Sequence, residues 1–145
     1  MKAITVPGVL DSLSLIAELI KSASAEAQLS KKAAYNLRLA VDEIATNIIM
    51  YGYEDANIEG TIDVHVSMDD DALTVTMEDT GVTYDPFQSL SKEEETVDRS
   101  LSDRPIGGLG ILLTVQGVDQ FIYERSGDRN RNIFKVYRTP LPESP

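Results

Sequence analysis

Two polar residues, Glu43 and Asn47, are four residues apart in an otherwise apolar helical pattern that runs from Ser30 to about Tyr51. At that spacing their side chains lie one above the other on the same helix face. A buried carboxylate and carboxamide need polar partners, so the pair is either solvated at the helix edge or part of a site. In a site, the amide oxygen of Asn47 would ligate a hard cation such as Mg²⁺, shared with phosphates. Glu43 would then be placed to accept a proton near that metal.

A second group of residues, Asp79-Thr80-Gly81, follows a run in which apolar and polar residues alternate. Aspartate and glycine favour turns, so a simple turn is one interpretation. The functional alternative is that the carboxylate of Asp79 accepts a hydrogen bond from a purine amino group. Gly81, which has no side chain, would let the purine ring approach the backbone.

A third group, Gly107-Gly108-Leu109-Gly110, opens an apolar run that contains Ile111, Leu112 and Val115. Glycines at a helix N-terminus expose backbone N–H groups that suit a phosphate, although such a cluster is also common in ordinary loops. No Gly-Lys-Ser/Thr follows, so this is not a Walker loop. No strand directly precedes the glycines, so a Rossmann dinucleotide motif is excluded as well.

The rest of the pattern predicts the elements that must position these groups. Ser30 is placed to cap the central helix, and Gly52 is placed to end it. One face of the predicted hairpin is apolar, so a layer of helices should cover it. We predict helices at 9–24 and 30–51, strands at 2–6, 118–124 and 132–138, a hairpin over 61–79 that turns at 69–71, and a polar turn at 126–130.

The composition limits the class of protein. A chain of 145 residues predicts one domain with a real core. Without cysteine, the fold uses neither disulfides nor thiolate metal sites, and we expect a cytoplasmic protein. By length and composition, no segment is a transmembrane or signal sequence. The net charge of −11 argues against nucleic acid and anionic membranes as partners, and it is compatible with a basic or neutral protein.

Taken in order, these motifs resemble the N, G1 and G2 boxes of the GHKL ATPase superfamily. The segments VDEIATNIIMYGY, EDTGVTYDP and GGLGILL are most similar to the stand-alone anti-sigma-factor serine/threonine kinases of bacteria. The resemblance covers nearly the whole chain. It implies the Bergerat fold, an α/β (α+β) two-layer sandwich in which helices cover one face of a mixed sheet. It also implies a single kinase domain over 1–145 with an ATP lid at 82–106.

The resemblance gives each motif residue a role. Asn47 would ligate Mg²⁺ bound to the phosphates of ATP, and Glu43 would be the general base for a serine hydroxyl of a protein substrate. Asp79 would bind the amino group of adenine, and Gly81 would let the base approach. The chemistry would be in-line phosphoryl transfer, in which positioning and metal electrostatics dominate.

The same resemblance places Gly108 and Gly110 at the phosphates, and Arg104 is our candidate for the γ-phosphate contact. The chain departs from the family after Gly81, where Val82-Thr83 stand and the G1 box often has a second glycine. Related histidine kinases carry a helical dimer with a phosphoacceptor histidine. This chain has no room for one, so we expect no complete sensor kinase.

The resemblance implies a kinase that phosphorylates a STAS-type anti-sigma-factor antagonist, with a sigma factor as a further partner and a homodimer as a compatible assembly. Two alternatives stay open. One is a nucleotide-gated binding module with weak or no kinase activity, and the other is a free-standing ATPase that uses water as acceptor. Glu43 favours the kinase, because a pure binding module needs no base at that position.

Overall fold

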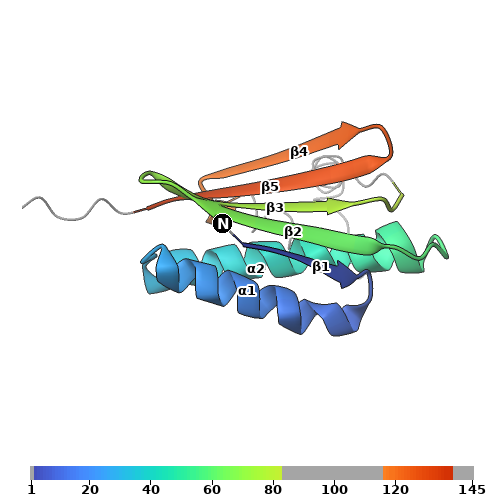
Figure 1. Cartoon of the computed structure of the whole chain (residues 1–145), viewed down its shortest axis with the longest axis horizontal. Coiled ribbons are helices and arrows are strands. Elements are labelled where there is room, and N and C mark those ends of the chain that lie inside the picture. Colours follow the sequence, from blue (N-terminus) through green and yellow to red (C-terminus); the bar gives the residue numbers. More distant parts are fainter. Residues whose placement is uncertain (1, 83–115, 139–145) are drawn as a thin grey trace, which may run out of the picture.

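The computed structural model of the chain describes residues 2–82 and 116–138. In this part of the chain, helices and strands form two layers, a sheet and a pair of helices (Figure 1). The elements are β1 (Lys2–Pro7), a 3-10 helix η1 (Leu10–Ser12), α1 (Leu13–Glu26), α2 (Lys31–Asn47), a π-helix η2 (Ile48–Glu54), β2 (Thr61–Met68), β3 (Ala72–Asp79), β4 (Gln120–Ser126) and β5 (Arg129–Tyr137).

The sheet has the strand order β1-β2-β3-β5-β4. Each of the four pairings is antiparallel, so a parallel pair of the kind a mixed sheet contains is not among the described strands. Both long helices lie against the same face of the sheet, and the other face carries no helix in the described part of the chain (Figure 1). The predicted α+β two-layer sandwich, with its helices on one side, is confirmed.

The core lies between these layers, and α2 supplies much of it. The helix begins as predicted, because the Ser30 hydroxyl accepts a hydrogen bond from the Ala33 backbone N–H at 3.1 Å. The apolar residues that recur at helical spacing from Ala34 to Ile49, and that predict the core-facing side of this helix, are buried apart from the half-buried Ala34. Burial of large apolar side chains is the main stabilising contribution of such a layer. The buried members of the predicted set are Leu37, Val41, Ile44, Ala45, Ile48 and Ile49.

The prediction that Gly52 ends the central helix is wrong. The helix continues from α2 through the π-helix η2 as far as Glu54, and the Asp55 N–H donates to the Met50 carbonyl, five residues back, at 2.8 Å. The Gly52 carbonyl instead accepts a hydrogen bond from the Val82 N–H at 3.0 Å. The wider π turn therefore places a backbone acceptor where the chain that leaves β3 passes by.

The turn of the second hairpin is shorter than predicted. The strands extend to Ser126 and start again at Arg129, which leaves only Gly127 and Asp128 as the loop. Gly127 has φ +60°, a left-handed conformation that two-residue hairpin turns require and that glycine adopts readily. The polar residues at 126–130 indicated a turn, but Ser126, Arg129 and Asn130 are strand residues. The side chains of Arg129 and Asn130 have polar partners on other strands of the sheet.

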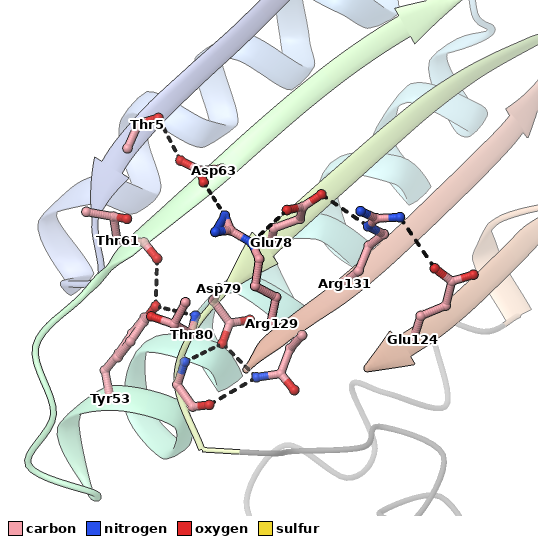
Figure 2. A network of polar contacts seen from close by, with 12 residues as sticks. Thr5, Tyr53, Thr61, Asp63, Glu78, Asp79, Thr80, Glu124, Arg129 and Arg131 are labelled. Atoms are coloured by element: carbon pink, nitrogen blue, oxygen red, sulfur yellow. Dashed lines mark hydrogen bonds and ion pairs between the residues drawn. The ribbon is translucent and has the colours of Figure 1, made fainter. Parts of the chain in front are cut away.

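Ion pairs cross the uncovered face of the sheet (Figure 2). Arg129 contacts Asp63 at 2.6 Å and Glu78 at 3.0 Å, and Arg131 contacts Glu78 at 3.1 Å and Glu124 at 3.6 Å. Such partly exposed pairs are each worth little, about 0–1 kcal/mol, but together they keep β2, β3, β5 and β4 in register. None of the described helices is long and apolar enough to cross a membrane.

Candidate functional site

Asp79, the last residue of β3, has a buried carboxylate, of which one oxygen accepts hydrogen bonds and the other has no partner among the described residues. Its side chain is 2% exposed. Oδ1 accepts hydrogen bonds from the Gly81 backbone N–H and from Nδ2 of Asn130, both at 2.9 Å (Figure 2). Oδ2 is buried and has no partner among the described residues. Burial raises the pKa of Asp79, and the hydrogen bonds from Asn130 and Gly81 oppose that rise.

Asn130 on β5 fixes the orientation of this carboxylate. Its Oδ1 accepts hydrogen bonds from the Tyr123 hydroxyl at 2.6 Å and from the Arg125 guanidinium at 3.0 Å. Its Nδ2 must therefore face the other way, where it donates to Asp79 and, at 3.2 Å, to the Gly81 carbonyl. The two donors on β4 thus fix the orientation of the Asn130 amide, and this amide fixes the orientation of the Asp79 carboxylate. Oδ2 of Asp79 is left without a partner among the described residues and can accept a hydrogen bond from a ligand.

A small cavity adjoins Asp79, with a volume of about 10 Å³. This is room for about one water molecule, so a purine requires its walls to move apart. A second acceptor, Oδ1 of Asn132, is buried in the cavity wall without a partner in the described part of the chain. The lining consists of three residues of the central helix, the residue pair at and after the end of β3, and two polar residues of β5, namely Ile44, Ile48, Gly52, Asp79, Val82, Asn130 and Asn132.

Gly81 has a packing role that the sequence did not reveal. A Cβ atom at this position would lie 2.7 Å from the Gly52 carbonyl oxygen and 2.9 Å from the Gly52 carbonyl carbon. The residue must therefore be glycine for β3 and η2 to approach each other, independently of any ligand. The approach of a purine to Gly81 stays a prediction.

The central helix carries the other two predicted groups, Glu43 and Asn47. Asn47 is 3% exposed, so the interpretation of the pair as solvated is wrong for this residue, and its Nδ2 is buried without a described partner. Glu43 is half-buried, and its pKa is raised, first by burial and then by the charge of Asp42. Their neighbours Ile44 and Ile48 line the Asp79 cavity, which places both residues on the stretch of helix beside it.

The donor set fits a shared metal rather than a metal held by protein alone. No group of three or more His, Cys, Asp or Glu residues that could hold an ion exists in the described ranges. Mg²⁺ commonly takes one or two protein ligands and completes its shell with substrate phosphates and water. The amide oxygen of Asn47 would be such a ligand, whereas its unpartnered Nδ2 is a hydrogen-bond donor and cannot bind a cation.

Three predicted phosphate contacts lie outside the described residues. Gly108, Gly110 and Arg104 all fall within 83–115, as does nearly all of the predicted lid at 82–106. Their roles stay predictions.

The sequence interpretation missed Tyr53, which joins the parts of the site. Its hydroxyl donates to the Thr61 carbonyl at 2.6 Å and accepts from the Thr80 N–H at 2.9 Å (Figure 2). Its ring packs so closely on Gly8 and Gly60 that a Cβ atom at either glycine would clash with it. Tyr53 thus holds the residue next to Asp79 against the end of the helix.

Asn130 and Asn132 were also missed, although the sequence held a signal for them. The two residues alternate with Arg129, Arg131 and Ile133, so they occupy the face of β5 that also carries the buried Phe134. Polar residues at core-facing positions of a strand are unusual and indicate a polar network or a site.

Comparison with known proteins agrees with this geometry. The fold and the order of the motifs define a GHKL-type ATPase domain. More narrowly, the chain belongs to the family described as the histidine kinase-like ATPase domain, which matches residues 6–135. A solved histidine kinase domain, from the Erythrobacter litoralis EL346 blue-light activated histidine kinase, has the same fold. It superimposes with a TM-score of 0.53 at 19% identity and covers 88% of this chain and 60% of that one.

Two similar curated proteins carry the name Serine-protein kinase RsbW. The protein from Staphylococcus aureus (strain MRSA252) is 27% identical over 96 residues, which is 62% of this chain and 58% of that protein. The protein from Bacillus licheniformis is 33% identical over 91 residues, which is 59% of this chain and 53% of that protein. The matched part of this chain therefore spans only somewhat more than half the length of each relative.

Proposed function

We propose that this domain is an ATP-dependent serine/threonine protein kinase that phosphorylates a STAS-type anti-sigma-factor antagonist and thereby acts as an anti-sigma regulatory factor. The observation that carries the proposal is the free Oδ2 of buried Asp79, held in place by Asn130. Leaving a buried acceptor without a partner costs about 1–3 kcal/mol, which a ligand donor would recover. The 6-amino group of adenine is such a donor.

The described residues divide into a base-binding part and a phosphate-binding part. Asp79 would receive the adenine amino group. Asn47 would hold Mg²⁺, which supplies charge neutralisation for the phosphates when it is bound. Gly108, Gly110 and Arg104 would contact the phosphates from beyond the described ranges.

Glu43 would act as the general base. It would accept the proton of a substrate serine while the serine oxygen forms a bond to the γ-phosphorus. The bond between that phosphorus and the β–γ bridging oxygen breaks, and ADP and phosphoserine are the products. A raised pKa suits this role, because a base is most effective when its pKa is near the working pH.

The name of the relatives, Serine-protein kinase, supports the choice of acceptor. The STAS-type substrate, the sigma factor as second partner and a homodimer rest on the family resemblance, and the cytoplasmic location rests on the sequence composition. The net charge of −11 supports protein partners over nucleic acid or anionic membrane.

The test is to incubate the protein with Mg-ATP and candidate STAS proteins and to search for phosphoserine by mass spectrometry. Glu43→Gln should retain ATP binding and lose about 10²- to 10⁴-fold in transfer rate, because the amide cannot accept the proton. Glu18→Gln, at an exposed position of α1, is the matched control and should transfer phosphate at the wild-type rate. Nucleotide-dependent binding of the STAS protein without any phosphoserine would favour the binding module.

A second variant tests the environment of the base. Asp42 raises the pKa of Glu43 by charge repulsion. Asp42→Asn should therefore move the acidic limb of the pH–rate profile to lower pH, with little change of rate on the plateau. An unchanged profile, together with full activity of Glu43→Gln, would remove the general-base role from Glu43.

A further inference from the structure

A groove lies at the end of β1 and is distinct from the Asp79 cavity. Its volume is about 490 Å³, within the range of known ligand sites. It shares no lining residue with the Asp79 cavity. Its lining comes from the turn after β1, the helix and the loop before β2, and comprises Pro7, Gly8, Val9, Leu10, Asp11, Ile49, Glu54, Ile58, Glu59 and Gly60.

The apolar part of this groove is exposed. Val9, Leu10 and Ile58 are 50%, 48% and 41% exposed, and the buried Ile49 lies beneath them. Single exposed apolar residues are ordinary on protein surfaces. Three of them line this one groove, so an apolar side chain bound there would remove all three from water.

The charged residues that line the groove in the described part of the chain are all acidic. They are Asp11, Glu54 and Glu59, and no described lysine, arginine or histidine belongs to the lining. None of the three carboxylates forms an ion pair with another residue of the described ranges, although the carboxylates on the open face of the sheet do. The groove therefore offers unneutralised negative charge beside exposed apolar surface.

The walls of the groove are held in place before anything binds. The Gly8 N–H donates to the Gly60 carbonyl at 2.8 Å, which joins the turn after β1 to the loop before β2. Both glycines pack on the ring of Tyr53. A preformed site loses less conformational entropy on binding, which favours a specific ligand.

We infer that this groove binds a segment of a partner protein that presents one large apolar side chain flanked by lysine or arginine. The apolar side chain would enter between Leu10 and Ile58, and the basic residues would face Asp11, Glu54 and Glu59. A second copy of this chain is a poor occupant, because each copy carries a net charge of −11. The inference is independent of the phosphoryl transfer proposed above.

The test uses the full chain and a fluorescein-labelled peptide of sequence Gly-Lys-Arg-Leu-Lys-Arg-Gly, with binding followed by fluorescence anisotropy. Two matched peptides replace the leucine by serine or the four basic residues by glutamate. We expect saturable binding of the first peptide, weaker binding of the serine peptide and none of the glutamate peptide. Chemical-shift changes should be confined to residues 7–11, 49 and 54–60.

Charge reversal separates the groove from the overall charge of the protein. Glu59→Lys should weaken binding about 3- to 10-fold. Asp70→Lys makes the same change of net charge at the exposed β2–β3 turn, which lies at the other end of β2, and near physiological salt should change binding less than about two-fold. Equal effects of the two variants would overturn the inference, because the peptide would then sense only the net charge.

The apolar contact has its own test. Ile58→Ser should weaken binding of the leucine peptide but not of the serine peptide. Equal loss for both peptides would contradict the proposed contact. Self-association of the wild-type chain that Ile58→Ser abolishes, with no peptide binding, would assign the groove to a second copy and would also overturn the inference.

Discussion

At the scale of single residues, the site depends on a carboxylate that the fold satisfies only in part. Asp79 receives two hydrogen bonds on Oδ1 and none from a described residue on Oδ2. Buried polar groups are normally paired, and exceptions gather at functional sites. Nδ2 of Asn130 donates to Oδ1 of Asp79 and so leaves Oδ2 as the oxygen without a described partner. Asn130 is therefore a positioning residue that acts through Asp79.

This role of Asn130 predicts that the effect of its substitution on nucleotide affinity depends on the 6-amino group of the adenine. Asn130→Ala should weaken ATP binding about ten- to hundred-fold, as expected for loss of a hydrogen bond to a charged group. Purine riboside triphosphate lacks the 6-amino group and should bind the wild type correspondingly weakly. The variant should bind this analogue nearly as well as the wild type does. Calorimetry that finds the same loss with both nucleotides would show that Asn130 serves the fold alone.

The raised pKa of Asp79 predicts how stability depends on pH. Because the folded-state pKa lies above the ordinary 3.8, folding favours the protonated carboxyl. The stabilising contribution is present below the unfolded pKa and is lost as the pH rises through the folded pKa. Asp79→Asn has no such titration. The free energy of unfolding of the wild type should therefore fall relative to the variant as the pH rises above the ordinary pKa of aspartate.

A control with the opposite sign is available at Asp63. Its pKa is lowered, first by the hydrogen bond from Thr5 and also by Arg129, against the opposing effect of burial. Its contribution is present above the ordinary pKa and is lost as the pH falls through the folded value. Relative to Asp63→Asn, the wild type should therefore lose stability in acid. If denaturation shows that the wild type also loses stability in acid relative to Asp79→Asn, the assignment of the raised pKa to Asp79 is contradicted.

At the scale of elements, the site depends on how closely η2 approaches the end of β3. The Gly52 carbonyl accepts the Val82 N–H, and Gly81 lies against the Gly52 backbone. Tyr53, the next residue, holds the Thr80 N–H. The π turn thus presents successive groups to the segment that carries the aspartate. Such π segments are frequent at functional sites.

Two glycine variants compare the two sides of this contact. Gly81→Ala should destabilise the protein by about 1–3 kcal/mol, because its Cβ would overlap the Gly52 backbone. Gly52→Ala should be tolerated or slightly stabilising, because its Cβ would meet only ordinary contacts at 3.9–4.0 Å and alanine favours helix. Urea denaturation of both variants measures the difference. Equal loss of stability would mean that the close contact does not determine the choice of glycine.

The elements also show how far sequence reasoning reaches. The apolar periodicity of α2 and the alternation in β2 and β3 predicted these elements and their buried faces correctly, because both patterns follow from one-sided burial. The predictions of a helix end at Gly52 and of a turn over 126–130 were wrong, because the partners of these residues come from distant parts of the chain. Gly52 bonds to Val82, and Arg129 pairs with Asp63 and Glu78. Local composition carries no information about such contacts.

The candidate site divides in the same way. Asp79 and Asn47 were found from motif spacing, and both prove to be buried with an unpartnered polar atom. Asn130 and Tyr53 were not found, because their roles arise from strand pairing and from packing between segments. The register Asp79↔Asn130↔Arg125 exists only once three strands are side by side.

At the scale of the whole molecule, the Asp79 cavity, which we propose as the nucleotide site, lies at one end of β3. The open face of the sheet carries paired charges, whereas the three carboxylates of the groove beside β1 have no ion-pair partner among the described residues. With a net charge of −11, long-range attraction favours basic partners and weakens as salt increases.

The last prediction separates a kinase from a free-standing ATPase. A kinase should hydrolyse ATP slowly when alone, because a site shaped for a serine side chain positions water poorly. It should form a stable complex with its STAS-type substrate, most tightly with nucleotide bound. Gel filtration of the purified pair with ADP, with a non-hydrolysable ATP analogue and without nucleotide measures this dependence. Asp79→Asn should lose the nucleotide effect while it retains any contact that does not involve the nucleotide. Fast hydrolysis by the isolated protein, with no complex under any of the three conditions, would identify an ATPase and reject the kinase.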